Sequence, residues 1–257
     1  MILSVVNHKG GTGKTTTTVN LGSGLAAAGK RVLLIDFDPQ GSLSYSLGLA
    51  DQSLTIADVL TGDCTMQEVM QQREGMDVLA ANSTLADVEL AMAKSEEHLS
   101  HLKNILVTLS GYEYVLIDCP PTLSLLTLNA LAGSDFVIIP MQMDVLALRG
   151  LDSMLDILKK INLINKHIEV LGVLPVMVEP RKNIYQEILR HIQTHYDVRI
   201  FENVIRSSVK AAEAPSFGKS VVAHAPLSTT AMDYKKLVSE MLQIEETAYR
   251  NRHPINL

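Results

Sequence analysis

The chain has 257 residues, 47% of them hydrophobic and 4% aromatic, with no tryptophan and a formal net charge of −6. This length and composition suit one large domain with an aliphatic core, which is typical of buried parallel strands. Two cysteines exclude a disulfide framework or a metal cluster made of cysteines alone, and no apolar run reaches the roughly 18 residues of a membrane span. No signal peptide fits before the first motif, so we expect a cytoplasmic protein.

Short apolar runs alternate with helical patterns along almost the whole chain. We expect strands over 2–6, 31–35, 77–80, 114–117, 136–139, 170–178 and 197–201. We expect helices over 15–28, 55–60, 66–71, 123–131, 148–161, 184–195 and 227–249, a short helical stretch within 36–49, and helical segments between 80 and 109. This alternation predicts an α/β fold, with a doubly wound, mostly parallel sheet flanked by helices, in a single domain over 1–257.

The first expected strand runs directly into a glycine-rich segment that precedes a helix. Such a turn directs a row of backbone N–H groups at one anion, and its glycines let the backbone approach phosphates closely. Lys14 stands where a P-loop lysine reaches the β- and γ-phosphates, and Thr15 where a hydroxyl meets Mg²⁺. A chance glycine-rich turn is disfavoured by the strand before it and the helix after it. The predicted phosphate-binding residues are Lys9, Gly10, Gly11, Thr12, Gly13, Lys14, Thr15 and Thr16.

Lys9 is a second cation immediately before the first glycine, where an ordinary P-loop needs none. Two like charges this close repel each other unless an anion lies between them. Lys9 therefore either serves its own nucleotide or reaches the nucleotide of a facing subunit, and we count it with Lys14 among the catalytic residues. The alternative is a solvated surface lysine.

Carboxylates follow two further expected strands, as Asp36 and Asp38 after one and Asp118 after the other. Ligands of doubly wound sheets lie at the carboxyl ends of the strands, so we expect these acids around the P-loop. An apolar strand ending in Asp118 has the form of a Walker B acid beside Mg²⁺. We interpret Asp36 as a supporting metal residue and Asp38 as the residue that positions water, although a helix cap or a turn former is the alternative for both.

The charge is unevenly distributed along the chain. Residues 51–100 hold ten acids and two bases, whereas residues 181–219 hold seven bases and four acids. The default explanation of the basic segment 181–219 is a solvated charged face. The more specific explanation is a surface patch that contacts the phosphates of a nucleic acid. The candidate DNA-binding residues are Arg181, Lys182, Arg206, Lys210 and Lys219.

The segment from Lys9 to Ser42 closely resembles the ParA/Soj branch of the deviant Walker A P-loop ATPases. The resemblance continues through 114–121 and 135–140 and returns at 213–216. It implies ATP and Mg²⁺ as cofactors, an ATP-dependent homodimer, binding of the dimer to non-specific DNA, and slow hydrolysis stimulated by a ParB-like or other cargo-linked activator. Lys9 would be the signature lysine, Asp38 would orient the attacking water, and Thr15, Asp36 and Asp118 would hold Mg²⁺.

The chain departs from the family pattern at Ser42 and within 204–210. In relatives the second of these loops helps to frame the base, so the preference for ATP over GTP rests on the family likeness, with Arg206 as the remaining nucleotide-contact candidate. The resemblance also implies a nucleoid-associated protein that positions a plasmid, a chromosome region or a protein cargo. The sequence leaves the cargo open.

Three other functions share parts of these motifs. A membrane-associated ATPase of the MinD type needs a basic amphipathic C-terminal helix, which residues 242–257 fit poorly, so we expect no membrane binding. An iron-protein-type ATPase needs thiolate ligands, whereas we interpret Cys119 as a buried packing residue. A nucleotide-gated adaptor without turnover is disfavoured by Asp38.

Overall fold

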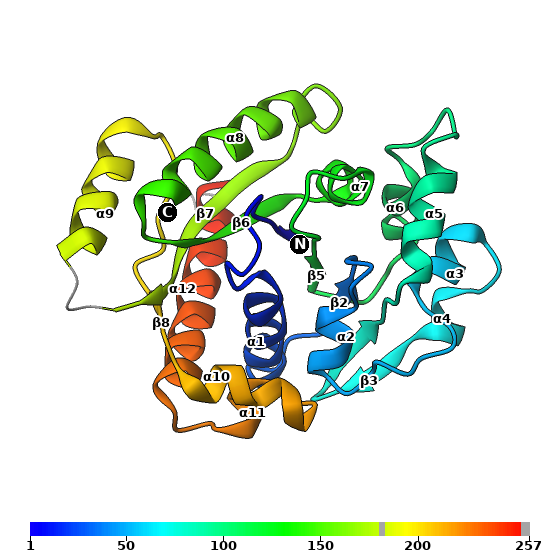
Figure 1. Ribbon diagram of the computed structural model, residues 1–257, viewed down its shortest axis with the longest axis horizontal. Helices are drawn as coiled ribbons and strands as arrows, with labels where there is room; N and C mark the ends of the chain where they lie inside the picture. Colours follow the sequence, from blue (N-terminus) through cyan, green and yellow to red (C-terminus); the bar gives the residue numbers. More distant parts are fainter. Residues whose placement is uncertain (180–182, 253–257) are drawn as a thin grey trace, which may run out of the picture.

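The computed structural model describes residues 1–179 and 183–252, which build one eight-stranded sheet in the order β3-β4-β2-β5-β1-β6-β7-β8 (Figure 1). All neighbouring strands run parallel except β3 and β4, which are antiparallel. The expected doubly wound, mostly parallel sheet is thus confirmed. The strands are β1 (Ile2–Val5), β2 (Val32–Asp36), β3 (Gln71–Arg73), β4 (Met76–Leu79), β5 (Tyr114–Asp118), β6 (Phe136–Gln142), β7 (Glu169–Val178) and β8 (Ile205–Arg206).

Helices cover both faces of the sheet, and each face has its own core. One core includes side chains of α3, α5, α6, α7, α8 and α9, and the other includes side chains of α1, α2, α11 and α12. In chain order the helices are α1 (Lys14–Ala27), α2 (Ser42–Ser46), α3 (Ile56–Thr61), α4 (Met66–Val69), α5 (Thr84–Met92), α6 (His101–Leu106), α7 (Leu125–Gly133), α8 (Val145–Ile161), α9 (Asn183–His195), α10 (Val209–Glu213), the 3₁₀ helix η1 (Ala214–Phe217), α11 (Val221–His224) and α12 (Thr229–Arg252).

The central strands are buried on both faces because helices cover them from both sides. Every residue of β2 and β5 is buried, so these strands read as continuous apolar runs that end in an aspartate. β5 lies between β2 and β1, and the register pairs Asp36 with Asp118. The sheet therefore brings the ends of three strands that precede candidate site residues to one edge.

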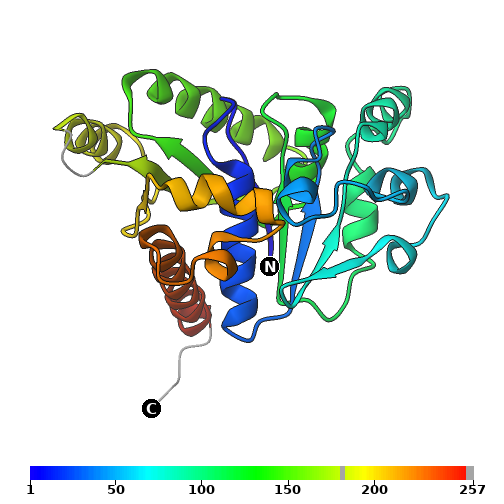
Figure 2. The same cartoon turned by 60° about the horizontal axis from the view of Figure 1, so that its bottom comes forward.

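Helix α1 is wedged between the sheet and α12, and these two helices run side by side (Figure 2). A Cβ atom added at Gly22 would lie 2.6 Å from Cδ2 of Leu34, and one added at Gly24 would lie 2.8 Å from Cγ2 of Val238. Real Cβ atoms do not approach other atoms so closely, so a larger residue at either position would displace the Leu34 or Val238 side chain, and glycine serves packing here rather than a backbone angle.

The expected strand over 197–201 is wrong. Only Ile200 pairs with β7, as an isolated bridge to Val173, and the next true strand is β8. The carboxylate of Glu240 on α12 accepts the backbone N–H groups of Glu202 and Asn203, at 2.8 and 3.0 Å, so these groups are bonded to a helix and not to β7. This competing acceptor comes from residues far along the chain, so local pattern did not indicate it.

Several short elements were not expected from the sequence. The antiparallel edge strand β3 is three polar residues long and is joined to β4 by a tight turn at Glu74 and Gly75, both at positive φ. α10, η1 and α11 follow β8, in a segment for which the sequence indicated a positive charge and a family resemblance at 213–216 but no helix. Elements of two to five residues have too little periodicity to be distinguished from loops.

Candidate functional site

The glycine-rich segment forms the expected cradle between β1 and α1. Gly11 and Gly13 have φ values of 71° and 75°, a left-handed conformation that favours glycine. Helix α1 begins immediately afterwards at Lys14, so the backbone N–H groups of its first turn point at the cavity. The cavity has a volume of about 880 Å³ and is lined by residues 10–16 on one side and by residues 38–42 and Tyr45 on another.

Lys14 reaches this cavity from a buried position. Lys14 is 7% exposed, and its Nζ donates one hydrogen bond, to the carbonyl oxygen of Lys9 at 3.3 Å. Burial lowers the pKa of Lys14, while the charges of Asp118, Cys119 and Asp38 act in the opposite direction. A buried ammonium with a single protein acceptor among the described residues is suited to an anionic ligand such as a phosphate.

Thr15 and Asp118 are joined directly. The Thr15 hydroxyl donates to Oδ2 of Asp118 at 2.6 Å, and the Thr18 hydroxyl donates to Oδ1 of the same residue at 3.3 Å. Hydroxyl and carboxylate oxygens are the hard ligands that Mg²⁺ prefers, and Mg²⁺ completes such a shell with phosphate and water oxygens. The described residues contain no group of three or more His, Cys, Asp or Glu side chains that could hold a metal by itself, so this pair fits an ion that arrives with a nucleotide.

Asp36 lies behind this pair and is fully buried. Its Oδ2 accepts the backbone N–H and the hydroxyl of Ser44, at 2.8 and 2.7 Å, and its Oδ1 accepts the backbone N–H of Asp38 at 3.2 Å. Burial raises the pKa of Asp36 to about 7, and burial followed by the charge of Asp36 raises the pKa of Asp118. Two neighbouring carboxylates in this environment favour a proton or a cation between them.

These raised pKa values predict a specific pH dependence for the nucleotide-free protein. The folded pKa of Asp36 lies above its unfolded value of 3.8, so its stabilising effect is present below pH 3.8 and is lost as pH rises toward about 7. Relative to an Asp36→Asn variant, the wild type should lose about 1.4 kcal/mol of unfolding free energy per pH unit in this window. Urea unfolding at several pH values measures this slope, and parallel profiles for the two proteins would contradict it.

Asp38 lines the cavity and is 8% exposed. Its Oδ1 accepts the backbone N–H of Gln40 at 2.9 Å, while its Oδ2 has no hydrogen-bond partner among the described residues. The turn-forming role weighed as an alternative is therefore present in the structure. The second oxygen is left available to a ligand or water in the cavity.

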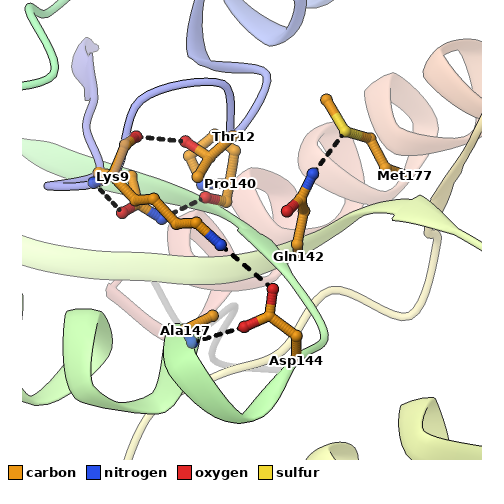
Figure 3. Close-up of polar contacts among 8 residues, drawn as sticks. Lys9, Thr12, Pro140, Gln142, Asp144, Ala147 and Met177 are labelled. Carbon is orange, nitrogen blue, oxygen red and sulfur yellow. Dashed lines mark hydrogen bonds and ion pairs between the residues drawn. The ribbon is translucent and has the colours of Figure 1, made fainter.

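Lys9 does not line the phosphate cavity. Its Nζ contacts Oδ2 of Asp144 at 3.2 Å, at the start of α8 (Figure 3). Asp144 was not identified from the sequence, although the signal was available, because it follows the end of β6 and precedes a helix as an N-cap residue does. Tyr45 and Met177, which also line the cavity, carry no local sequence signal.

The basic candidates of the late segment are spread over different environments. Arg206 forms hydrogen bonds to both carboxylate oxygens of Asp233, which is 3% exposed, and Lys210 pairs with Glu213 at 2.8 Å. Lys219 is exposed. Arg181 and Lys182 lie outside the described residues.

A second cavity of about 240 Å³ adjoins the phosphate cradle and shares Gly13, Thr16 and Met177 with it. Arg206 and Tyr234 line its other side. Its position beside the cradle suits the nucleoside part of a nucleotide, which is the place that the sequence assigned to Arg206. Arg206 would act there while its guanidinium remains bonded to Asp233.

Comparison with known proteins extends over nearly the whole chain. A family model described as an AAA domain matches residues 1–170. The chain is 36% identical over 252 residues to the chromosome partitioning protein ParA of Caulobacter vibrioides (strain NA1000 / CB15N), covering 95% of this chain and 94% of that protein. It is 37% identical over 249 residues to the sporulation initiation inhibitor protein Soj of Bacillus subtilis (strain 168), covering 93% and 97%. Cobyrinic acid a,c-diamide synthase from Mycobacterium smegmatis, solved with an ATP analogue and magnesium, superposes with a TM-score of 0.77 at 33% identity, covering 89% of this chain and 97% of that chain.

Proposed function

Since the chain belongs to the ParA/Soj family of P-loop ATPases, we propose that it positions a cargo by an ATP-driven cycle of dimerisation, DNA binding and release. It is an ATP hydrolase that uses Mg²⁺. In the proposed cycle, ATP forms the homodimer, the dimer binds non-specific DNA, and a ParB-like or other cargo-linked activator stimulates hydrolysis. The protein would then be cytoplasmic and nucleoid-associated, with a plasmid, a chromosome region or a protein assembly as its cargo.

The observation that carries the proposal is that Lys14, Thr15 and Asp38 line one cavity, with the buried Asp118 bonded to the Thr15 hydroxyl. Phosphoryl transfer requires positioning and charge neutralisation more than covalent chemistry by the protein. Bound Mg²⁺ supplies charge neutralisation at the phosphates. Lys14 would bind the phosphate oxygens, Thr15 and Asp118 would hold the metal and its ligand shell, and Oδ2 of Asp38, which has no partner among the described residues, would orient the attacking water.

Dimerisation is supported by the surface beside the cradle. Leu123, Val145 and Leu146 are 44%, 63% and 69% exposed, and Val145 and Leu146 directly follow the ion-paired Asp144. Large apolar side chains exposed next to a ligand site are common at interfaces. A two-fold symmetric interface at this face would contain the Lys9 contact twice, once from each subunit.

DNA binding is supported by the exposed cations of the late segment, Lys210 and Lys219. The affinity of a protein for DNA depends steeply on the number of phosphates it neutralises, so a dimer gains strongly over a monomer. We expect Asp38→Ala protein with ATP to bind unrelated duplexes and the same protein with ADP to bind them weakly. Equal binding in both nucleotide states would remove the proposed switch.

The basic patch itself is tested by a Lys210→Glu, Lys219→Glu variant. A dimer of this variant loses four potential phosphate contacts. The plot of log affinity against log salt concentration should therefore become shallower, with a slope less negative by roughly 3 to 4. Lys159→Glu is a matched control, because Lys159 also forms an exposed i,i+3 ion pair, with Asp156, but lies on α8. Titration of duplex DNA at rising salt measures these slopes, and an unchanged slope in a variant that still dimerises would exclude the patch.

A membrane-associated MinD-like role is the first alternative. Sedimentation of the Asp38→Ala protein with ATP and anionic liposomes tests it. No helix among the described residues is long and apolar enough to cross a bilayer. The tail segment 242–257, on which the expectation of no membrane binding rests, lies partly outside the described residues. A nucleotide-gated adaptor without turnover is the other alternative, and an ATPase assay with DNA and activator distinguishes it.

A further inference from the structure

Lys9 and Asp144 form an ion pair across the ends of two neighbouring parallel strands, β1 and β6 (Figure 3). Nζ of Lys9 lies 3.2 Å from Oδ2 of Asp144, and the two side chains are 42% and 41% exposed. Residues 10–16, which include Lys14, line the phosphate cavity, whereas Lys9 does not. The ammonium group of Lys9 is therefore held beside the cradle rather than in it.

The backbone of Lys9 is held by hydrogen bonds that do not involve its ammonium group. Its N–H donates to Oδ1 of Asn7 at 2.9 Å, and Nδ2 of Asn7 donates to the carbonyl oxygen of Pro140 on β6 at 2.7 Å. Its carbonyl oxygen accepts from Nζ of Lys14 and from the hydroxyl of Thr12, both at 3.3 Å. The Lys9 side chain can therefore change its rotamer while these backbone hydrogen bonds of the loop are kept.

Asp144 is held in place independently of Lys9. It is the N-cap of the 17-residue helix α8, and its Oδ1 accepts the backbone N–H of Ala147 at 2.8 Å. A helix N-terminus stabilises a carboxylate through its unpaired N–H groups and its dipole. Asp144 is thus a pre-positioned anion that presents its second oxygen, Oδ2, to Lys9.

We propose that Asp144 is a positioning residue that holds Lys9 out of the nucleotide site and thereby opposes ATP-driven dimerisation. A phosphate oxygen and Oδ2 of Asp144 compete for the same ammonium group, so the dimer forms only when the phosphate displaces the carboxylate. This inference rests on the dimerisation step of the proposed function. An ion pair of this exposure shifts an equilibrium about two- to fivefold, and a symmetric dimer breaks it twice, so the combined effect is about 4- to 25-fold.

The test is the dimer dissociation constant with Mg-ATP in an Asp38→Ala background, measured by analytical ultracentrifugation. Asp144→Asn removes the charge and retains an equally good N-cap, so the helix is preserved. We expect its dissociation constant to fall about 4- to 25-fold relative to the parent. Asp156→Asn is the matched control, because it removes an exposed ion pair with Lys159, at 2.9 Å, on the same helix, and it should leave the constant unchanged.

A second measurement follows the ion pair itself. A carbodiimide joins an amine to a contacting carboxylate without a spacer, so mass spectrometry of nucleotide-free protein should detect a Lys9–Asp144 cross-link. Its yield should fall several-fold when Mg-ATP is added to the Asp38→Ala protein, while the Lys159–Asp156 cross-link stays constant.

The outcomes separate this inference from the proposed function. A parent that dimerises with ATP while Asp144→Asn dimerises no more tightly overturns the inference and leaves the proposed cycle intact. A Lys9–Asp144 cross-link that persists in the ATP dimer overturns it as well. A parent that stays monomeric with ATP at all concentrations removes the dimerisation step and this inference with it.

Discussion

Replacing Lys14 with alanine should lower the affinity for ATP at least about 100-fold. Each charge-assisted hydrogen bond contributes about 1.5–3 kcal/mol, and a P-loop lysine makes such bonds to more than one phosphate. The structure supports this role, because the buried ammonium of Lys14 has one protein acceptor among the described residues and burial lowers its pKa. Titration with a fluorescent ATP analogue measures the effect.

Lys30→Ala is the matched control for this experiment. Lys30 follows the other end of the same helix and pairs with Glu113 at 3.0 Å, outside the cavity. Its replacement should leave ATP affinity unchanged. Similar losses of affinity in the two variants would show that the effect of Lys14 comes from general destabilisation of α1, and thermal unfolding of both proteins would detect it.

Replacing Asp38 with alanine should lower activator-stimulated turnover about 100- to 10,000-fold while ATP still binds, because positioned proton acceptors contribute about this much to a rate. One oxygen of Asp38 holds the Gln40 turn, and the other is available in the cavity. The protein should therefore accumulate in its ATP-bound form. Phosphate release in single-turnover mode measures the chemical step.

Asp38→Asn separates the two roles of this residue. Asparagine can still accept the N–H of Gln40 and form the turn, but it carries no negative charge. We expect Asp38→Asn to be as slow as Asp38→Ala and as stable as the wild type. Wild-type turnover in Asp38→Asn would assign Asp38 to the turn alone.

The sequence predicts the centre of the fold well and its edges poorly. The buried strands β1, β2, β5 and β6 are long apolar runs in a region of strict alternation, so local pattern and final structure agree there. At the edge, Ile200 forms a single bridge to β7, and the backbone N–H groups of residues 202 and 203 donate to Glu240 instead of to the sheet. Local sequence patterns do not predict hydrogen bonds between residues that lie far apart in the chain.

The same division holds within the site. The motif and the strand-end rule predict that Lys14, Thr15, Asp38 and Asp118 lie together, because a parallel sheet aligns the ends of its strands. The direction of the Lys9 side chain could not be predicted in this way. It depends on Asp144, which is 135 residues away in the chain, and an exposed lysine side chain can adopt several rotamers.

Two glycines of α1 determine how closely this helix packs against its neighbours. Gly22 lets the helix approach the sheet and Gly24 lets it approach α12, and a methyl group at either position would force Leu34 or Val238 to move. Close packing on both faces opposes a shift of α1 along its axis when a nucleotide binds at its N-terminus. The contacts of Lys9 and Asp144 at the rim of the cradle are exposed, so they can change with less repacking than the contacts behind α1.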